Sequence, residues 1–195
     1  MPIEDIVSGC FRINGLDHNC KRSTYRGNPH WDFAPGSIAV GSYDWQWKEM
    51  GGGMLFLDVY IPSGSSILKA YLRFQAERGC IGPNCHSYIR GEDCSFPTAF
   101  TTMANYDARP RTSAMVDYSN MPTWNFPLQY NSVDFAPVVQ EIIDRPDWVE
   151  GCNMVIFWDD HDGRSTPGHQ NSRHAQAWRS GCSICPILSV IWEKP

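Results

Sequence analysis

Met54–Glu77, MLFLDVYIPSGSSILKAYLRFQAE, is the stretch from which the fold class can be inferred. Apolar residues occupy every second position in two runs, which are Leu55, Leu57, Val59 and Ile61, then Leu68, Ala70, Leu72 and Phe74. A period of two predicts β-strands with one buried face. Pro62 and Gly64 favour a turn between the runs, because proline fixes φ and glycine adopts conformations that other residues avoid. We therefore expect an antiparallel strand pair, joined by a loop of about five residues, in a larger all-β core.

The remainder of the chain favours an antiparallel β-sandwich. Further strands are expected at residues 38–47, 153–158 and 186–192. Gly51–Gly53 is expected to free the backbone just before the first apolar run. Aromatic residues make up 13% of the chain and charged residues 19%, with 16 glycines and 14 prolines. That composition suits short strands and structured loops better than helices or disorder.

One segment is predicted to be helical. In DFAPVVQEIIDRP the apolar residues recur at three-to-four spacing, which indicates a short α-helix near residues 135–144 with one buried stripe. Asp134 is placed to cap its first turn, and Pro146 ends it because proline cannot continue a helix.

The two ends of the chain differ in pattern. Residues 1–37 are polar and rich in turn residues, and they are predicted to form an irregular N-terminal arm, with the β-sandwich domain at residues 38–195. Such an arm either packs as a flap on its own domain or extends onto another chain. Its apolar residues, which would form a short strand for the second purpose, are Ile3, Ile6, Val7 and Phe11.

Charge and hydropathy exclude two classes of partner. The formal net charge is -5, whereas a nucleic-acid partner requires a basic face. No run of 18 apolar residues occurs, so we expect no membrane span.

Eight cysteines occur: Cys10, Cys20, Cys80, Cys85, Cys94, Cys152, Cys182 and Cys185. An even count in a loop-rich β chain predicts disulfides and a secreted, oxidising location. The expected pairs are Cys10–Cys20, Cys80–Cys85, Cys94–Cys152 and Cys182–Cys185. The opening residues MPIEDIVSG contain neither a basic nor an apolar signal region. Either a leader precedes this numbering, or the chain is intracellular and its cysteines are thiols.

An acidic cluster makes calcium the candidate cofactor. Asp159, Asp160 and Asp162 follow a predicted buried strand, and hard carboxylate oxygens at a strand end suit Ca²⁺. A solvated acidic turn is the alternative. His161, His169 and His174 lie nearby at irregular spacing, which favours a transition-metal site less.

Catalytic motifs are missing from the sequence, and we expect no enzyme activity. No G-x-S-x-G motif frames any serine, and nothing selects a pair of catalytic carboxylates. Trp45 and Trp47 share one face of a predicted strand, where exposed aromatic rings can stack on sugars. Core packing is the alternative for these two residues.

The chain contains, in order, GGMLFLDVYIPSGSSILKAYLRFQAE, IRGE, ARPRTSAMVDY, FAPVVQEIIDRPDWVEGCNMVIFW, RHAQAW and CPILSVIW. These segments, within residues 38–192, resemble a family of DNRLRE-like, jelly-roll β-sandwich modules in secreted and surface proteins of bacteria and environmental sequences. The chain departs from the family pattern at Cys152 and Cys185, where cysteines interrupt its "GN" and "AP" motifs. The resemblance implies a jelly-roll fold, an extracellular location and an accessory or structural role.

Two functions follow as hypotheses. The first is a non-enzymatic extracellular structural protein, the subunit of a surface fibre or filament, in which the N-terminal arm adds a strand to a neighbouring copy. The second is a carbohydrate-binding module that uses Trp45 and Trp47, with calcium at Asp159–Asp162. The expected partners are accordingly other copies of the chain or glycans.

Overall fold

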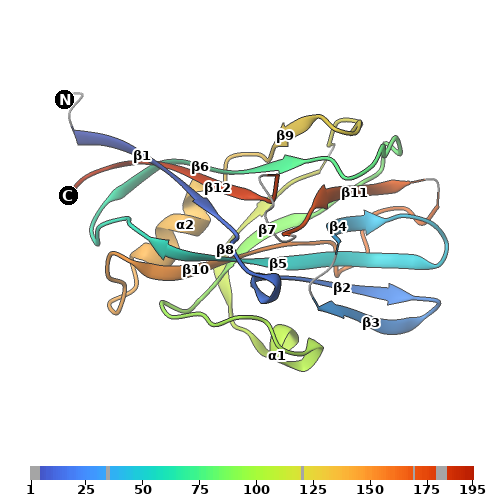
Figure 1. Ribbon diagram of the computed structural model, residues 1–195, viewed down its shortest axis with the longest axis horizontal. Coiled ribbons are helices and arrows are strands. Elements are labelled where there is room, and N and C mark those ends of the chain that lie inside the picture. Colours follow the sequence, from blue (N-terminus) through green and yellow to red (C-terminus); the bar gives the residue numbers. More distant parts are fainter. Residues whose placement is uncertain (1–4, 34–35, 120, 169, 179–183) are drawn as a thin grey trace.

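The computed structural model describes residues 5–33, 36–119, 121–168, 170–178 and 184–195. Two antiparallel β-sheets pack face to face, which confirms the predicted β-sandwich (Figure 1). The first sheet has the order β1 (Ile6–Arg12), β12 (Ile187–Glu193), β6 (Ser66–Gln75) and β9 (Gln129–Asn131). The second has the order β11 (Asn171–Gln176), β4 (Ser37–Ser42), β5 (Trp47–Val59), β10 (Cys152–Asp159), β7 (Tyr88–Glu92) and β8 (Arg111–Asp117).

Two further strands, two α-helices and a 3-10 turn complete the described fold. β2 (Asn19–Tyr25) pairs with β5 and with β3 (Asn28–Phe33). The helices are α1 (Met103–Ala108), α2 (Ala136–Ile143) and a 3-10 turn at Leu16–His18. Between the sheets, Phe74 of β6 stacks on Trp158 of β10 with ring centroids 4.4 Å apart. This contact joins the two sheets through the core.

The predicted pairing of the two apolar runs is wrong. β5 pairs with β2, β4 and β10, whereas β6 pairs with β12 and β9, so the two strands belong to opposite sheets. The residues between them cross from one sheet to the other, and Gly64 has the positive φ of 81° that their turn requires. Alternation indicates which face of a strand is buried, and it carries no information about the partner.

The inward face of β5 is also the opposite of the expected one. Met54 and Phe56 are buried in the core between the sheets. Leu55 is buried on the other face, in a second cluster with Phe100. Both faces of β5 are thus covered near its middle. Asp58 has a φ of 51°, and the pairing with β10 shifts register nearby, so the last residue of the strand returns to the inner core.

The predicted helix is confirmed as α2. Its expected apolar stripe is buried and consists of Val138, Val139, Ile142 and Ile143. Asp134 Oδ1 accepts hydrogen bonds from the backbone N–H groups of Ala136 and Ala70, both at 3.0 Å. Asp134 therefore joins the start of the helix to β6.

The N-terminal arm is regular, contrary to the prediction. β1 runs antiparallel along β12 with every residue from Ile6 to Arg12 in register, and β2 forms a hairpin with β3 and a ladder with β5. β1 and β3 lie at sheet edges, where their side chains are only partly covered, so these two segments lack a clear alternation of apolar and polar residues. Val7 and Phe11 pack against the core from β1, and Ile3 lies outside the described residues.

No helix within the described ranges is long and apolar enough to cross a membrane.

Candidate functional site

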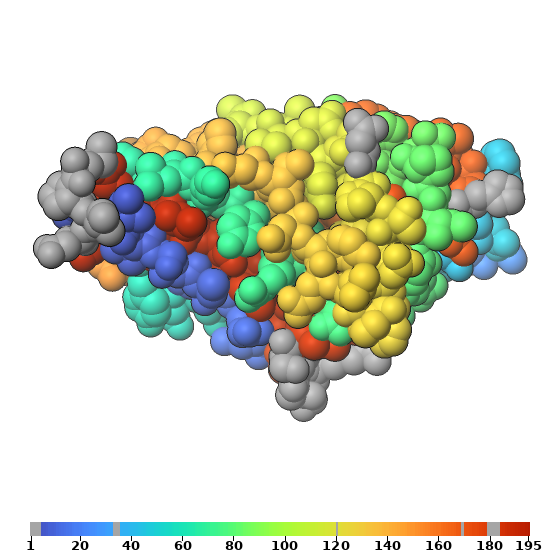
Figure 2. Space-filling view, turned by 90° about the horizontal axis from the view of Figure 1, so that it is seen from above, coloured from blue at the N-terminus to red at the C-terminus, as the bar shows by residue number. Residues whose placement is uncertain are grey.

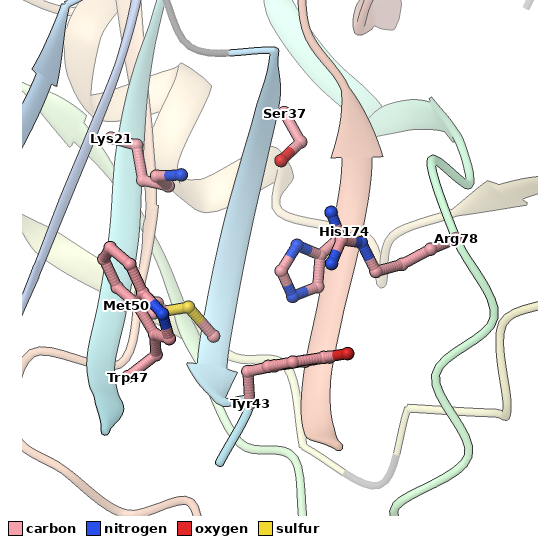
Figure 3. A pocket seen from close by; sticks show the side chains of 7 residues that line it. All are labelled: Lys21, Ser37, Tyr43, Trp47, Met50, Arg78 and His174. Atoms are coloured by element: carbon pink, nitrogen blue, oxygen red, sulfur yellow. The ribbon is translucent and has the colours of Figure 1, made fainter. Parts of the chain in front are cut away.

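A pocket opens where β2, β4, β5 and β11 come together (Figure 3). Its volume is about 200 Å³. The lining side chains are Lys21, Ser37, Tyr43, Trp47, Met50, Arg78 and His174. Two of these are cations, two are large aromatics and none is an acid. We refer to this feature as the His174 pocket.

His174 forms the floor of the pocket. Its side chain projects from β11 toward the side of Lys21 and Trp47 (Figure 3), and the residue is only 7% exposed. Both ring nitrogens are buried, and neither has a hydrogen-bond partner in the part of the chain that the structure describes. Tyr43 contacts the imidazole edge-to-face, with ring centroids 5.5 Å apart.

The surroundings of His174 hold it in the neutral form. Burial, reinforced by the positive charges of Arg78 and Lys21, lowers the pKa of His174 from its usual 6.5 to about 3. A neutral imidazole presents one donor and one acceptor nitrogen.

Stability should depend on pH through this residue. In the unfolded chain this histidine is protonated as the pH falls below about 6.5. In the folded protein its pKa is about 3, so it stays neutral down to a much lower pH. The free energy of unfolding should therefore fall as the pH drops from 6.5 toward 3, by at most about 1.4 kcal/mol per pH unit from His174. We expect the His174→Gln variant to lose this slope, measured by urea unfolding across the range. Equal slopes in the two proteins would contradict the assignment.

The two cations are held near the aromatic rings. Lys21 Nζ lies 5.8 Å from the centroid of the Trp47 ring, and the Arg78 guanidinium lies 5.5 Å from that of Tyr43. Each also has an acidic partner outside the lining: Asp32 at 3.5 Å from Lys21, and Glu77 at 2.6 Å from Arg78. The cations are thus oriented, and their remaining donors stay available to a ligand.

The predicted aromatic pair is separated by the fold. Trp47 opens β5 and packs against Tyr25 and His30, with ring centroids 4.3 and 4.9 Å away, so its ring is fixed beside the pocket. Trp45 is 71% exposed in the turn between β4 and β5. Asp44 Oδ1 accepts hydrogen bonds from two backbone N–H groups of this turn, including that of Trp47. The turn breaks the strand on which both residues were expected to lie.

The predicted calcium ligands are not gathered around one point. Asp160 is fully buried, and its carboxylate accepts hydrogen bonds from the backbone N–H groups of Arg164 and Ser165, both at 3.0 Å. Asp162 faces the Arg164 side chain at 3.5 Å, and Asp159 is buried. Among the residues that can be described, no three His, Cys, Asp or Glu side chains are placed to hold a metal ion. Asp160 and Asp162 thus contact groups of the same loop at the place where calcium was expected. Calcium assistance stays a prediction.

The neighbouring histidines are likewise divided. His161 is half-buried and hydrogen-bonds to the Tyr106 hydroxyl at 3.0 Å and to the Glu49 carbonyl at 2.8 Å, while His174 lies in its pocket. His169 lies outside the described residues. Each of the two described histidines therefore has its own environment.

The predicted disulfides are not formed between described residues. The free thiols are Cys10, Cys20, Cys80, Cys85, Cys94, Cys152 and Cys185. Cys10 is exposed on β1, whereas Cys20 is fully buried in the cluster around Leu55, so the fold directs these two sulfurs into different surroundings. Cys182, the expected partner of Cys185, lies outside the described residues.

Cys80 and Cys85 act as core side chains in the structure. Cys80 Sγ lies 3.9 Å from the Ser172 hydroxyl, and Cys85 Sγ lies 4.0 Å from the Val40 carbonyl. Burial raises the pKa of the Cys85 thiol to about 12 and that of Cys80 in the same direction. Such thiols stay protonated and react slowly.

A second feature lies beside β1. A groove of about 640 Å³ separates β1 from the end of β5, and we call it the β1 groove. Val7, Gly9 and Phe11 line one side, and Leu57 and Tyr60 line the other. In the space-filling view, β1 (blue) lies along the rim of the first sheet next to β12 (red) (Figure 2). Within the described ranges, β1 pairs with β12 alone, and no strand pairs with β5 beyond Met54 on the β2 side.

No protein-family model matches the chain, and no curated protein matches it. The resemblance to DNRLRE-like modules stays a prediction. Function must therefore be inferred from the β1 groove and the His174 pocket.

Proposed function

We propose that this protein is a non-enzymatic, extracellular structural protein, the subunit of a filament in which β1 of one copy pairs with β12 of the next. The strand supports this role because a continuous backbone ladder holds it, together with partial burial of Val7 and Phe11. All seven residues of β1 are in register with β12, yet none of the seven is buried. β12 is buried along nearly its whole length and needs a strand at this edge.

The β1 groove makes exchange between copies favourable. β1 borders open space on the side of β5, and the apolar contacts that break when the strand leaves are mainly those of Val7 and Phe11 with the core. Residues 13–15 join β1 to the 3-10 turn. A neighbour's β1 would make the same contacts with β12 that the chain's own strand makes. The exchange therefore costs little free energy at equilibrium.

Strand exchange of this kind produces a chain of subunits. Each copy gives β1 to one neighbour and accepts β1 from another, which is a head-to-tail contact. Such contacts extend into a filament unless the rotation between copies closes a ring. The extracellular location rests on the resemblance to secreted modules and on the even number of cysteines.

A single substitution tests the proposal. Cys10 on β1 is directly opposite Ser189 on β12, and its Sγ lies 3.5 Å from the Ser189 hydroxyl. The Ser189→Cys variant places a second thiol against Cys10. Assembled protein is oxidised mildly and separated by electrophoresis without reductant. We expect a ladder of covalent dimers, trimers and longer species, because each new disulfide would join two subunits.

Two controls define the result. The variant carrying both Ser189→Cys and Cys10→Ser keeps the other cysteines and should give no ladder. A chain that lacks residues 1–12 should no longer assemble, as measured by sedimentation and electron microscopy. Disulfide-bonded monomers without a ladder would show that β1 stays on its own β12 and would overturn the proposal. Full assembly of the shortened chain would do the same.

A further inference from the structure

We propose that the His174 pocket binds one sugar ring that carries a carboxylate, such as a uronic acid residue of an acidic glycan. This inference goes beyond the filament proposal, because the pocket is lined from β2, β4, β5, β11, the turn after β4 and the segment after β6, and contains no residue of β1. The experiment on the pocket therefore tests this proposal independently of the filament proposal.

The size of the pocket selects a single ring. Its volume is about 200 Å³, which is smaller than the range of about 300–1,000 Å³ typical of sites for drug-sized ligands. Trp47 and Tyr43 both line it (Figure 3). Aromatic faces beside polar groups suit a sugar, whose C–H face is apolar and whose rim carries hydroxyls. Trp47 is already fixed by Tyr25 and His30, so little side-chain freedom is lost when a ligand binds.

His174 provides the strongest indication that a polar ligand belongs here. The residue is more than nine-tenths buried, and its two ring nitrogens lack partners among the described residues. A buried polar group without a hydrogen bond is unfavourable unless a ligand or water completes it. Sugar hydroxyls both donate and accept, which matches the one donor and one acceptor of a neutral imidazole. The Ser37 hydroxyl in the same lining adds a further donor and acceptor.

Charge distinguishes an acidic sugar from a neutral one. Lys21 and Arg78 line the pocket, and its lining contains no carboxylate. Their partners Asp32 and Glu77 lie outside the lining. Glu77 accepts hydrogen bonds from Arg78 Nε and Nη2 at 2.6 and 3.4 Å, which leaves for a ligand the Nη1 donors of Arg78 and those donors of the Lys21 ammonium that Asp32 does not take. A charge-assisted hydrogen bond from Arg78 Nη1 or Lys21 Nζ is stronger than a neutral one, so a ring bearing a carboxylate is preferred over its neutral counterpart.

Calorimetric titration of the full chain tests this assignment with two matched ligands. Methyl glucuronide carries a carboxylate where methyl glucoside carries a CH₂OH group. We expect the glucuronide to bind with a Kd on the order of 1 mM and the glucoside about tenfold more weakly. Trp47→Ala should weaken glucuronide binding about tenfold by removing the stacking surface. Arg78→Gln should bring the affinity for the glucuronide down to that for the glucoside.

Trp45→Ala is the control, since Trp45 is exposed and is not part of the pocket lining. It should leave both affinities unchanged. Circular dichroism checks that each variant is folded, and Tyr43→Ala replaces Trp47→Ala if that variant is not. Absence of glucuronide binding overturns the proposal. Equal binding of the two sugars, or an unchanged affinity in Arg78→Gln, overturns the preference for a carboxylate.

Discussion

Replacement of Arg173 by Met is expected to lower the free energy of unfolding by about 3–5 kcal/mol, the largest effect of any single polar residue. Arg173 projects from β11 and is completely buried. Its guanidinium donates four hydrogen bonds of 2.7–3.1 Å, all to backbone carbonyls: those of Gly82, Met121, Pro122 and Ser172. Each buried carbonyl left without a donor costs about 1–3 kcal/mol.

The Arg173 contacts join three separate segments of the chain. Arg173→Lys should be intermediate, because an ammonium donates from one atom and cannot reach carbonyls that surround a planar guanidinium. Arg26→Ala is the matched control, since Arg26 is exposed and hydrogen-bonds to the Gln46 side chain. We expect it to change stability by less than about 0.5 kcal/mol. Urea unfolding of the three variants measures these differences, and a loss below about 1 kcal/mol in Arg173→Met would contradict the prediction.

Gly52→Ala is expected to destabilise the fold by about 3 kcal/mol or more. A Cβ atom at Gly52 would lie 2.3 Å from the backbone carbonyl oxygen of Cys20 and 2.9 Å from Ile38 Cγ2. Because a backbone carbonyl in the β2–β5 ladder cannot rotate away, the two strands must move apart. Because hydrogen bonds between β2 and β5 are weakened, we expect the variant to unfold at a lower urea concentration than the unchanged protein.

Gly79→Ala provides the comparison for Gly52→Ala. Gly79 is exposed, and a Cβ there would lie 3.8 Å from its nearest neighbour, the Trp124 carbonyl oxygen. Both substitutions reduce the freedom of the unfolded chain to a similar extent. Gly79→Ala should therefore be neutral or slightly stabilising, and the difference between the two isolates the steric effect. Similar stabilities for both variants would show that the strands accommodate the methyl group.

The elements that sequence predicted well are those whose signal is local. The three-to-four spacing in residues 135–143, together with Asp134 and Pro146, was sufficient to place α2. The apolar runs at residues 153–158 and 186–192 became β10 and β12 because both strands are buried on both faces. Such patterns predict where a strand or helix forms, because the formation of these elements depends on residues that are close together in the sequence.

The His174 pocket could not be read from sequence. Its side chains come from four strands, the turn after β4 and the segment after β6, and neither Lys21 nor Arg78 stands out among 16 lysines and arginines. Trp47 was singled out for its residue type, and His174 was considered as a metal ligand. Only the packing of β11 against β4 places the imidazole beside Tyr43.

The sequence by itself determined the class of fold, since Met54–Glu77 already indicates strands with buried faces. The tertiary structure alone decided that β5 and β6 lie in opposite sheets, and that β1 completes the edge next to β12. It also gave Gly51–Gly53 a role opposite to the expected one: they lie inside β5, where neighbouring atoms approach too closely for a side chain. The physical reason is that side-chain alternation records burial, whereas strand pairing and close approach depend on residues far away in the chain.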